Sequence, residues 1–526
     1  MASRFDAIII GSGFGGSVTA CRLSEKGLKV LVLERGRRWD STTYPRAPGD
    51  PWVWDQQNPA KKNGWLDFRV QRGVCVAQGA GVGGGSLIYA NVLIDAPIWH
   101  FDRDWPAEIT FDELRPYYQR VQEMLCPCPV PANQLPERLK IVRDAAERSG
   151  YGSRFRALPV AITFDPQWDS RLENAYRPQY SKSWVNAHGK KQGTCIHCGN
   201  CYIGCPVHAR NTLDLNYLAR AEMHGAEVRP LHMVRCISQD GENYRVDFDR
   251  IVDGKLVPTA ETAQMVVVSA GSLGSTELLL RCRDQFGTLP ELSPTLGKNW
   301  SANGDFLTIS VHERRAFPTQ GPTITAAIDF LDGSQKNARF FVEDGGFPEV
   351  FRVFFEEGIP FQVKNLGFNA MVLGLALFLR RFGEFNQMMP WFAQSVDAST
   401  GELYLGRSLF RPWRRLLKLK WDTEASRETI EAVFSMHKQL AAATGGKPLV
   451  PFAWTLLKTL ITPHPLGGCR MGNSAQDAVV DHTGAVFNYP NLYVADGSVV
   501  PRAIGLNPSK TIAALAERTA EMMLQN

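Results

Sequence analysis

The chain begins with two apolar runs on either side of a glycine-rich turn. Residues 7–10 are Ala-Ile-Ile-Ile, and the turn, residues 11–16, follows at once. A stretch with apolar residues at helical spacing comes next and ends at Gly27, and the second run, Lys29 followed by the apolar residues 30–33, stops at Glu34. Short continuous apolar runs are typical of strands buried on both faces, and helical spacing between them indicates a helix. We therefore predict a strand–helix–strand unit here.

The turn fits the pattern G-x-G-x-x-G, which binds a dinucleotide when a strand precedes it and a helix follows it. Gly11 allows the tight turn, Gly13 lets the backbone approach a pyrophosphate, and Gly16 lets the helix pack closely on the strand. The N-terminus of the helix then faces the phosphates. Glu34 follows Gly11 by 23 positions and can accept hydrogen bonds from a ribose. The alternative, a glycine-rich turn without a ligand, does not explain the complete unit.

A second glycine-rich loop favours FAD over NAD as the dinucleotide. Residues 79–86 read Gly-Ala-Gly-Val-Gly-Gly-Gly-Ser, and they are flanked by the apolar residues Val76, Leu87 and Ile88. So many residues without a Cβ allow the backbone to approach a flat ligand closely. The alternative is a flexible loop, but the apolar flanks indicate a loop embedded in the core. We interpret it as a contact with the flavin ring.

The C-terminal part of the chain holds oriented polar residues between predicted elements. His464 lies between two prolines, which orient its side chain. Residues 491–495 read as a strand that ends on Asp496-Gly497, and Asn507-Pro508 precedes an amphipathic helix over residues 510–524. An Asn-Pro pair at this place fixes the backbone so that the first helical turn points donors at a ligand.

The region from about residue 310 to 455 is rich in Phe and Trp. Residues 401–406 and 418–421 alternate like strands with one buried face. A sheet over an apolar pocket suits a bulky hydrophobic ligand, although the same pattern fits an ordinary core. We expect an α/β protein with a Rossmann-like FAD-binding domain, residues 1–306 and 457–526. A substrate domain built on a mixed β-sheet would span residues 307–456.

These motifs together resemble the glucose-methanol-choline (GMC) flavoprotein oxidoreductases, and within them the cholesterol oxidase branch. The matching segments lie in the family's order along nearly the whole chain: residues 11–36, 79–86, 211–219, 464–469 and 496–508. The resemblance implies FAD as the cofactor and an alcohol as the substrate. The residues implied to bind the cofactor are Gly11, Gly13, Phe14, Gly15, Gly16, Glu34, Gly81, Gly83, Gly84, Gly85, Ser86, Asn91, Val234, Ala270, Asp496, Gly497, Asn507 and Pro508.

The resemblance also implies catalytic roles. Oxidation of an alcohol removes the hydroxyl proton and moves a hydride to flavin N5, so an acceptor for the proton must lie within hydrogen-bond reach. His464 would be the general base, and Asn507 would position the substrate oxygen because an amide does not titrate. The cholesterol oxidase branch also uses a glutamate for double-bond isomerisation, for which Glu349 is our candidate and Glu343 the fallback. The family's Asn-Gly-Gly near the flavin is replaced here by residues 89–91, Tyr-Ala-Asn.

Composition and charge exclude several classes. The 526 residues carry a net charge of +5, which is too weak to indicate a nucleic-acid partner. The N-terminus lacks the pattern of a signal peptide, from which we expect a cytoplasmic protein. The apolar run at residues 370–379 is shorter than the ~20 residues that span a bilayer. It reads as a core or pocket helix, or as a surface segment for peripheral membrane contact or substrate access.

Four of the eleven cysteines fall in one short run within residues 193–210. Cys195, Cys198, Cys201 and Cys205 have the spacing C-x2-C-x2-C-x3-C-P of bacterial ferredoxins, in which the fourth cysteine can ligate another cluster. We therefore expect a [4Fe–4S] or [3Fe–4S] cluster. Zinc is a weaker fit, because its cysteine pairs are usually separated by a dozen or more residues. Buried thiols without a metal remain the other alternative.

The sequence thus favours FAD-dependent oxidation of a bulky apolar alcohol, such as a sterol or terpenoid, with electrons leaving through the cluster to a protein or quinone acceptor. One alternative is an oxidase without a cluster that forms peroxide. A second is a flavin and iron–sulfur protein that only transfers electrons, and a third is an enzyme working in the reductive direction.

Overall fold

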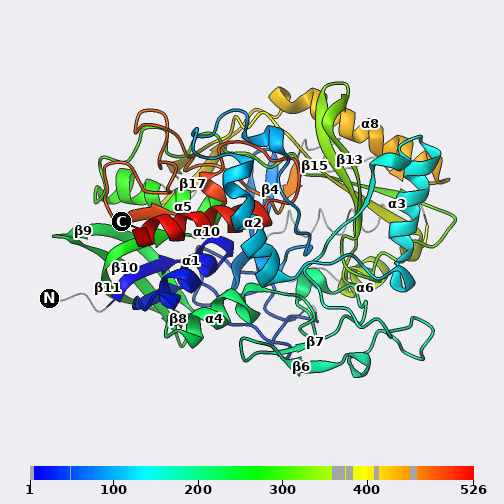
Figure 1. Ribbon diagram of the computed structural model, residues 1–526, viewed down its shortest axis with the longest axis horizontal. Coiled ribbons are helices and arrows are strands. Elements are labelled where there is room, and N and C mark those ends of the chain that lie inside the picture. Colours follow the sequence, from blue (N-terminus) through cyan, green and yellow to red (C-terminus); the bar gives the residue numbers. More distant parts are fainter. Residues whose placement is uncertain are drawn as a thin grey trace.

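The computed structural model describes residues 5–47, 49–357, 374, 383–407, 414–449 and 459–525. Two lobes are visible in Figure 1, one around the strands β9, β10 and β11 with helices α1 and α10, the other around β13 and β15 with α3 and α8. None of the described helices is long and apolar enough to cross a membrane. The apolar run at residues 370–379 lies outside the described residues except for Gly374.

A parallel sheet forms the centre of the first lobe. Its strands follow the order β8 (Glu227–Arg229), β2 (Val30–Leu33), β1 (Phe5–Ile10), β11 (Lys255–Val268) and β20 (Leu492–Val494), and each adjacent pair is parallel. The first half of β11 instead pairs antiparallel with β10 (Asn243–Val252), which pairs with β9 (His232–Asp240). The continuous apolar runs of β1 and β2 are buried, as expected for central parallel strands. The predicted Rossmann-like unit is therefore confirmed.

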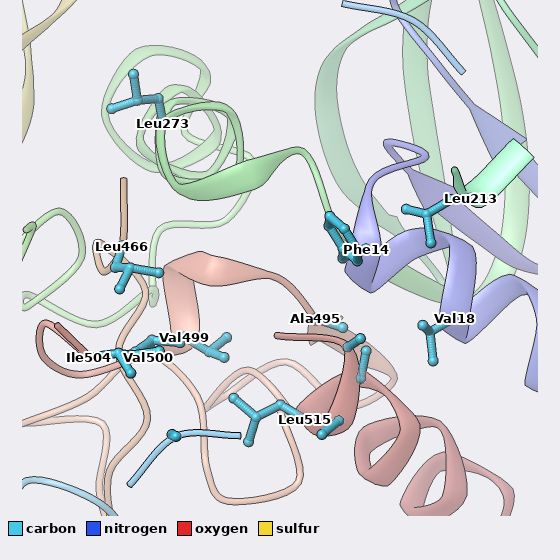
Figure 2. Close-up of a cluster of buried hydrophobic side chains, with 14 of the residues drawn as sticks. Phe14, Val18, Leu213, Leu273, Leu466, Ala495, Val499, Val500, Ile504 and Leu515 are labelled. Atoms are coloured by element: carbon cyan, nitrogen blue, oxygen red, sulfur yellow. The ribbon is translucent and has the colours of Figure 1, made fainter. Parts of the chain in front are cut away.

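Helices pack on this sheet and on one another, and they bring distant parts of the chain together. They are α1 (Phe14–Glu25), α2 (Phe111–Leu125), α4 (Tyr217–Met223), α5 (Gly271–Leu280) and α10 (Ser509–Gln525). Helix α1 packs against α4 and the C-terminal α10. Figure 2 shows part of the buried apolar cluster here, where Phe14 and Val18 of α1 lie near Ala495 and Leu515. The glycine turn at the start of α1 is thus packed against a continuous apolar core.

A six-stranded antiparallel sheet forms the centre of the second lobe. Its order is β18 (Lys447–Leu449), β12 (Phe306–Val311), β15 (Met388–Ser395), β14 (Ala338–Asp344), β13 (Ala326–Gln335) and β5 (Phe155–Ala157). Helices α3 (Glu137–Arg148) and α8 (Arg427–Ala443) pack on it, and α6 (Glu349–Glu357) follows β14. Strand β5 and helix α3 come from the N-terminal half of the chain, so this lobe is not a single continuous segment.

Three smaller sheets complete the fold of the described residues. A three-stranded sheet contains β19 (Leu460–Thr462), β4 (Val74–Gly79) and β3 (Leu66–Gln71), and hairpins are formed by β6 (Ser183–Val185) with β7 (Lys191–Gly193) and by β16 (Glu402–Arg407) with β17 (Arg415–Lys420). The strands expected at residues 401–406 and 418–421 exist. They pair with each other and contact α5, with Leu403, Leu417 and Leu419 buried, and Arg415 and Leu416 of β17 line the cavity described below.

Candidate functional site

A cavity of about 780 Å³ extends along the glycine turn of β1–α1 into the region between the two lobes. Most of the predicted cofactor residues line it: Gly11, Gly13, Phe14, Gly15, Glu34, Gly84, Gly85, Val234, Ala270, Asp496, Gly497, Asn507 and Pro508. The remaining five are packed beside the lining and are not part of it: Gly16, Gly81, Gly83, Ser86 and Asn91. The second lobe contributes Ile324 and Phe392. A cavity of this size suits a cofactor or a drug-sized ligand.

The glycine turn is built so that backbone atoms meet directly. A Cβ added at Gly15 would lie 1.5 Å from the carbonyl oxygen of Ala495, and one at Gly16 would lie 2.0 Å from that of Gly11. A Cβ at Gly13 would meet nothing within 4 Å. Gly15 and Gly16 are therefore required by packing. Gly13 instead borders open space that a bound ligand could fill.

Glu34 ties the end of β2 to this turn. Its Oε2 accepts from the Ser12 hydroxyl at 2.7 Å and from the Ser12 amide at 3.2 Å, and its Oε1 accepts from the Gly36 amide at 2.9 Å. The carboxyl group is buried but lines the cavity. Glu34 is thus held in place by three donors at the end of the strand where a ribose is bound in dinucleotide folds.

The second glycine loop contacts the first. A Cβ at Gly84 would lie 2.6 Å from Cα of Gly13, and Gly83 has a φ of +106°, a conformation that favours glycine. The Ser86 hydroxyl donates to the Gly83 carbonyl at 2.8 Å and accepts from the Leu213 amide at 3.1 Å. The loop is therefore a fixed wall of the cavity rather than a flexible segment.

His464 and Asn507, the predicted catalytic pair, line the same cavity. His464 follows β19, and its Nδ1 lies 3.0 Å and 3.1 Å from the two carboxyl oxygens of Asp305. Nε2 is thus the ring nitrogen left for the cavity. The Oδ1 of Asn507 is buried without a hydrogen-bond partner in the described part of the chain. A polar atom in this state is costly unless a ligand completes its hydrogen bonds.

The structure separates the two candidate glutamates. Glu349 lies on α6, pairs with Arg352 and is not part of the cavity wall. Glu343 on β14 is fully buried, and its Oε2 accepts from the Gln394 amide at 2.8 Å. Burial raises the pKa of Glu343 well above its usual range, opposed in part by the amides of Gln394 and Asn507. Glu343, not Glu349, is the glutamate that the fold brings to Asn507.

Asp305 is a site residue that our sequence reasoning missed. It is fully buried, and it also accepts from the Thr462 hydroxyl at 2.6 Å. Burial raises its pKa, whereas the adjacent His464 lowers it. Its position directly before an amphipathic strand gave no functional signal, because its partner His464 is 159 positions away.

The four clustered cysteines line one small internal space together with Arg210 and Gly321. The His197 amide donates to the Cys195 sulfur at 3.3 Å, and the Ala209 amide donates to the Cys205 sulfur at 3.2 Å. Burial raises the pKa of the Cys198 thiol to about 12, with the neighbouring Cys205 adding to the rise. All eleven cysteines are free thiols. In the described ranges, no group of three or more His, Cys, Asp or Glu side chains is arranged to hold a metal ion.

The cysteine space and the cofactor cavity are neighbours. Tyr202, next to Cys201 in sequence, lines the cofactor cavity, and so does Tyr89, whose hydroxyl donates to the Asn211 carbonyl at 2.9 Å. The guanidinium of Arg210 lies 5.1 Å from the centre of the Tyr89 ring. Arg210 and two tyrosines therefore lie between the thiols and the cavity.

Comparison with known sequences places the chain in a family. Residues 400–516 and 174–301 match two parts of the GMC oxidoreductases, and residues 9–53 match an NAD(P)-binding Rossmann-like domain. The matched segments contain the first glycine turn, the four cysteines and the His464–Asn507 pair.

Whole-chain relatives agree with these matches. The chain is 30% identical to a cholesterol oxidase of Acinetobacter baumannii, covering 98% of this chain and 93% of the relative. It is 31% identical to a cholesterol oxidase of Mycobacterium tuberculosis strain H37Rv, covering 99% and 91%. In fold it resembles the crystal structure of a pyridoxine 4-oxidase from Mesorbium loti, with a TM-score of 0.63 at 17% identity over 99% of this chain and 100% of that one. The chain belongs to the GMC oxidoreductase family, whose members bind FAD and act on alcohols.

Proposed function

We propose that this protein uses FAD to oxidise a bulky, apolar alcohol to the corresponding carbonyl compound. The observation that carries the proposal is that His464 and Asn507 line the same cavity as the two glycine loops. A proton acceptor and a dinucleotide cradle thereby face one space. The resulting arrangement meets the two needs of the reaction, a base near the hydroxyl and an electron acceptor near its carbon.

The residues present fit FAD. Open space borders Gly13, the glycine loops meet backbone to backbone, and the amide nitrogen of Gly271 donates to Asp496 at 2.8 Å beside the lining. FAD, when bound, supplies the two-electron acceptor for the hydride. Gly11 to Gly16 and Glu34 would hold its ADP half, and Asn507 with Pro508 would lie at the flavin.

The chain's own residues would handle the proton. His464 would take the hydroxyl proton at Nε2, since its Nδ1 is engaged with Asp305. Asn507 would orient the alcohol oxygen through its amide group, which does not titrate. Glu343 lies behind Asn507, where a protonated carboxyl would keep the buried wall neutral.

The residues that line the cavity near His464 favour an apolar alcohol as the substrate. Phe392, Ile324 and Tyr89 line it beside His464, and the ring centres of Phe392 and His464 are 6.1 Å apart. Apolar and aromatic walls with few polar groups are typical of pockets for hydrophobic ligands. The relatives named cholesterol oxidase also favour a sterol-like or otherwise bulky substrate.

We further propose that Cys195, Cys198, Cys201 and Cys205 hold a [4Fe–4S] or [3Fe–4S] cluster through which electrons leave to a protein or quinone acceptor. Three observations support it: the ferredoxin spacing, the shared internal space, and the amides that donate to two of the sulfurs. A cluster is larger than one ion, so its thiols surround a volume rather than a point. The alternative is a peroxide-forming oxidase with metal-free thiols.

A protein that only relays electrons between flavin and cluster is the second alternative. It would have no need for a histidine and an amide in the wall of the cofactor cavity, so the His464–Asn507 pair disfavours it.

The test of the oxidation is the anaerobic reduction of bound flavin by apolar alcohols, followed by absorbance. His464→Ala and Asn507→Ala are expected to keep FAD and to lose reduction by alcohol. His224→Ala, an exposed histidine after α4, is the matched control and should behave as the wild type. Full reduction in His464→Ala would contradict the role assigned to that residue.

The test of the cluster is the iron and acid-labile sulfide content of anaerobically purified protein. We expect about three or four irons per chain, lost in Cys198→Ser. The control is Cys126→Ser, because Cys126 is exposed and lies outside the cysteine space. Wild-type protein that contains flavin but no iron, even after reconstitution with iron and sulfide, would contradict the cluster and leave the oxidase alternative.

A further inference from the structure

We propose that Asp305 is a positioning residue for His464, which keeps the proton of the neutral imidazole on Nδ1 and so leaves the lone pair of Nε2 free for the alcohol. This inference rests on the proposed function, because it presumes that His464 is the base. It concerns a residue that no motif of the sequence singled out.

Asp305 holds His464 at two points, the ring and the backbone. Both carboxyl oxygens of Asp305 lie within 3.1 Å of Nδ1 of His464. The hydroxyl of Thr462 donates to Oδ2 of Asp305 at 2.6 Å and accepts a hydrogen bond from the backbone amide of His464 at 2.9 Å. The side chain and the backbone of His464 are therefore fastened to the same carboxyl group, one directly and the other through Thr462.

The chemistry of the acceptor decides the tautomer. An ionised carboxyl group can only accept hydrogen bonds, so a neutral histidine that faces it must carry its proton on the nitrogen between them. Asp305 is fully buried beside β12, and no water is needed to complete this contact. Nε2 is then unprotonated, and it is the ring nitrogen left for the cavity that His464 and Asn507 both line.

The ionisable groups near the Asp305–His464 pair are also acidic. Asp397 lies close enough to Asp305 to raise its pKa, and Glu343 on β14 lies behind Asn507. Asp397 is satisfied by its own donors, among them the Ser301 hydroxyl and the amides of residues 302 and 304. Asp305, in contrast, faces His464 directly. When His464 takes a proton, the resulting imidazolium faces the Asp305 carboxylate, which stabilises it.

Every atom and electron that leaves the alcohol has an acceptor. The alcohol O–H bond breaks and its proton moves to Nε2, while the C–H bond breaks and its hydride leaves with two electrons to the bound two-electron acceptor. The carbon–oxygen bond becomes a carbonyl. Asp305 exchanges no proton in this scheme, because it acts only through the orientation and charge of His464.

A merely structural role would predict a different outcome. Asp305 could serve only to anchor the start of β12 to β19 through Thr462, in which case its replacement would change stability but not the pH dependence of the reaction. The informative variant is Asp305→Asn, which keeps the shape but offers an amide that can donate to Nδ1. The proton of the histidine would then shift to Nε2, which blocks the base.

The experiment compares wild type, Asp305→Asn and Asp305→Glu in anaerobic flavin reduction by an apolar alcohol, from about pH 5 to about pH 9. We expect Asp305→Asn to bind FAD, to keep KM within a few-fold, and to lose about 10²–10⁴-fold in the limiting rate, with an altered pH profile. Asp305→Glu should recover part of the rate. An unchanged rate and pH profile in Asp305→Asn, with reduction lost in His464→Ala, would overturn this inference and leave the proposed function intact.

A second measurement uses the wild-type protein, so it does not depend on whether a variant folds. Long-range ¹H–¹⁵N correlation spectra of ¹⁵N-histidine-labelled protein report which ring nitrogen carries the proton, with the His464 signals assigned by their loss in His464→Gln. We expect the Nδ1–H form for neutral His464. The Nε2–H form would overturn the inference. Normal reduction by alcohol in His464→Ala would instead remove the proposed function on which it rests.

Discussion

Nε of Arg210 donates to Oδ1 of Asn91 at 2.6 Å and so joins the cysteine segment to the loop that follows the second glycine run. The same guanidinium donates to the backbone carbonyls of Ser86, Leu87 and Tyr89 at 2.8–2.9 Å. Arg210 also lines the space between the cysteines. One buried side chain therefore supports the wall of the cofactor cavity and borders the candidate cluster.

Replacing Arg210 should loosen that wall. In Arg210→Met, the three carbonyls and the Asn91 side chain lose a charged donor, and each buried acceptor left unpaired costs roughly 1–3 kcal/mol. We expect weaker FAD binding, measured by the flavin retained after dialysis, and a lower midpoint of urea unfolding. Arg210→Lys keeps the charge but not the planar set of donors, so it should recover only part of the loss. Unchanged flavin content in Arg210→Met would contradict this role.

The glycine turn permits a paired test of packing against ligand space. Gly15→Ala places a Cβ 1.5 Å from the Ala495 carbonyl oxygen, whereas Gly13→Ala places one where nothing lies within 4 Å. We expect Gly15→Ala to unfold or to lose at least ~1–3 kcal/mol of stability, as other overpacked sites do. Gly13→Ala should fold with normal stability in the absence of FAD but bind FAD more weakly. The checks are thermal unfolding and flavin fluorescence, and equal FAD affinity in Gly13→Ala would argue against a cofactor there.

A buried ion pair fastens the second lobe. Arg138 and Asp344 are both fully buried, and Arg138 also donates to the backbone carbonyls of Pro322 at 2.7 Å and Gly345 at 2.9 Å. Arg138→Met leaves the carboxylate buried without its partner, so we expect a loss of about 3–5 kcal/mol in the free energy of unfolding.

The matched control for this prediction is an exposed pair. Arg427 and Glu431 lie on the surface of α8, and Arg427→Met should change the unfolding free energy by less than about 1 kcal/mol. Urea unfolding of both variants gives the comparison. Equal effects at the two sites would show that the buried pair contributes no more than the exposed one.

The pH dependence of stability should depend on His100. Its ring is fully buried between Phe101 and Trp105, and neither ring nitrogen has a partner in the described part of the chain. Burial lowers the pKa of His100 to about 3, with Arg502 adding to the decrease. The unfolded chain has the ordinary value near ~6.5, so between these two values it binds more protons at this residue than the folded chain.

Stability should therefore fall as pH decreases below about 6.5, by up to ~1.4 kcal/mol per pH unit from this one histidine. His100→Phe removes the titrating group but keeps an aromatic ring. The difference in unfolding free energy between about pH 7 and about pH 5 should then shrink, as measured by urea unfolding at both values. An identical pH dependence in wild type and variant would contradict this prediction.

The parts of the fold that the sequence predicted are those that local patterns determine. Two apolar runs and the glycines between them were enough to identify β1, α1 and β2, because parallel strands at the centre of a sheet are apolar on both faces. The pairing of β16 with β17 was not predicted, since alternation alone shows that one face is buried but not against which element.

The site could be predicted only in part, for the same reason. His464 and Asn507 lie within local motifs, so the sequence could single them out as candidates, and both line the cavity. Asp305 acts across 159 positions, and no periodicity reports such a contact. Glu343 and Glu349 are six positions apart at the end of a strand and the start of a helix, and only the three-dimensional fold shows that the first is buried beside Gln394 while the second pairs with Arg352.

The central claim, that the cofactor cavity is the place of alcohol oxidation, is tested most directly by one measurement. Purified protein loaded with FAD is mixed anaerobically with an apolar sterol or long-chain alcohol, and the loss of flavin absorbance is compared with the carbonyl product formed. We predict one equivalent of product per flavin reduced, and little reduction by a sugar alcohol at similar concentration. Flavin that dithionite reduces but no apolar alcohol reduces would contradict it.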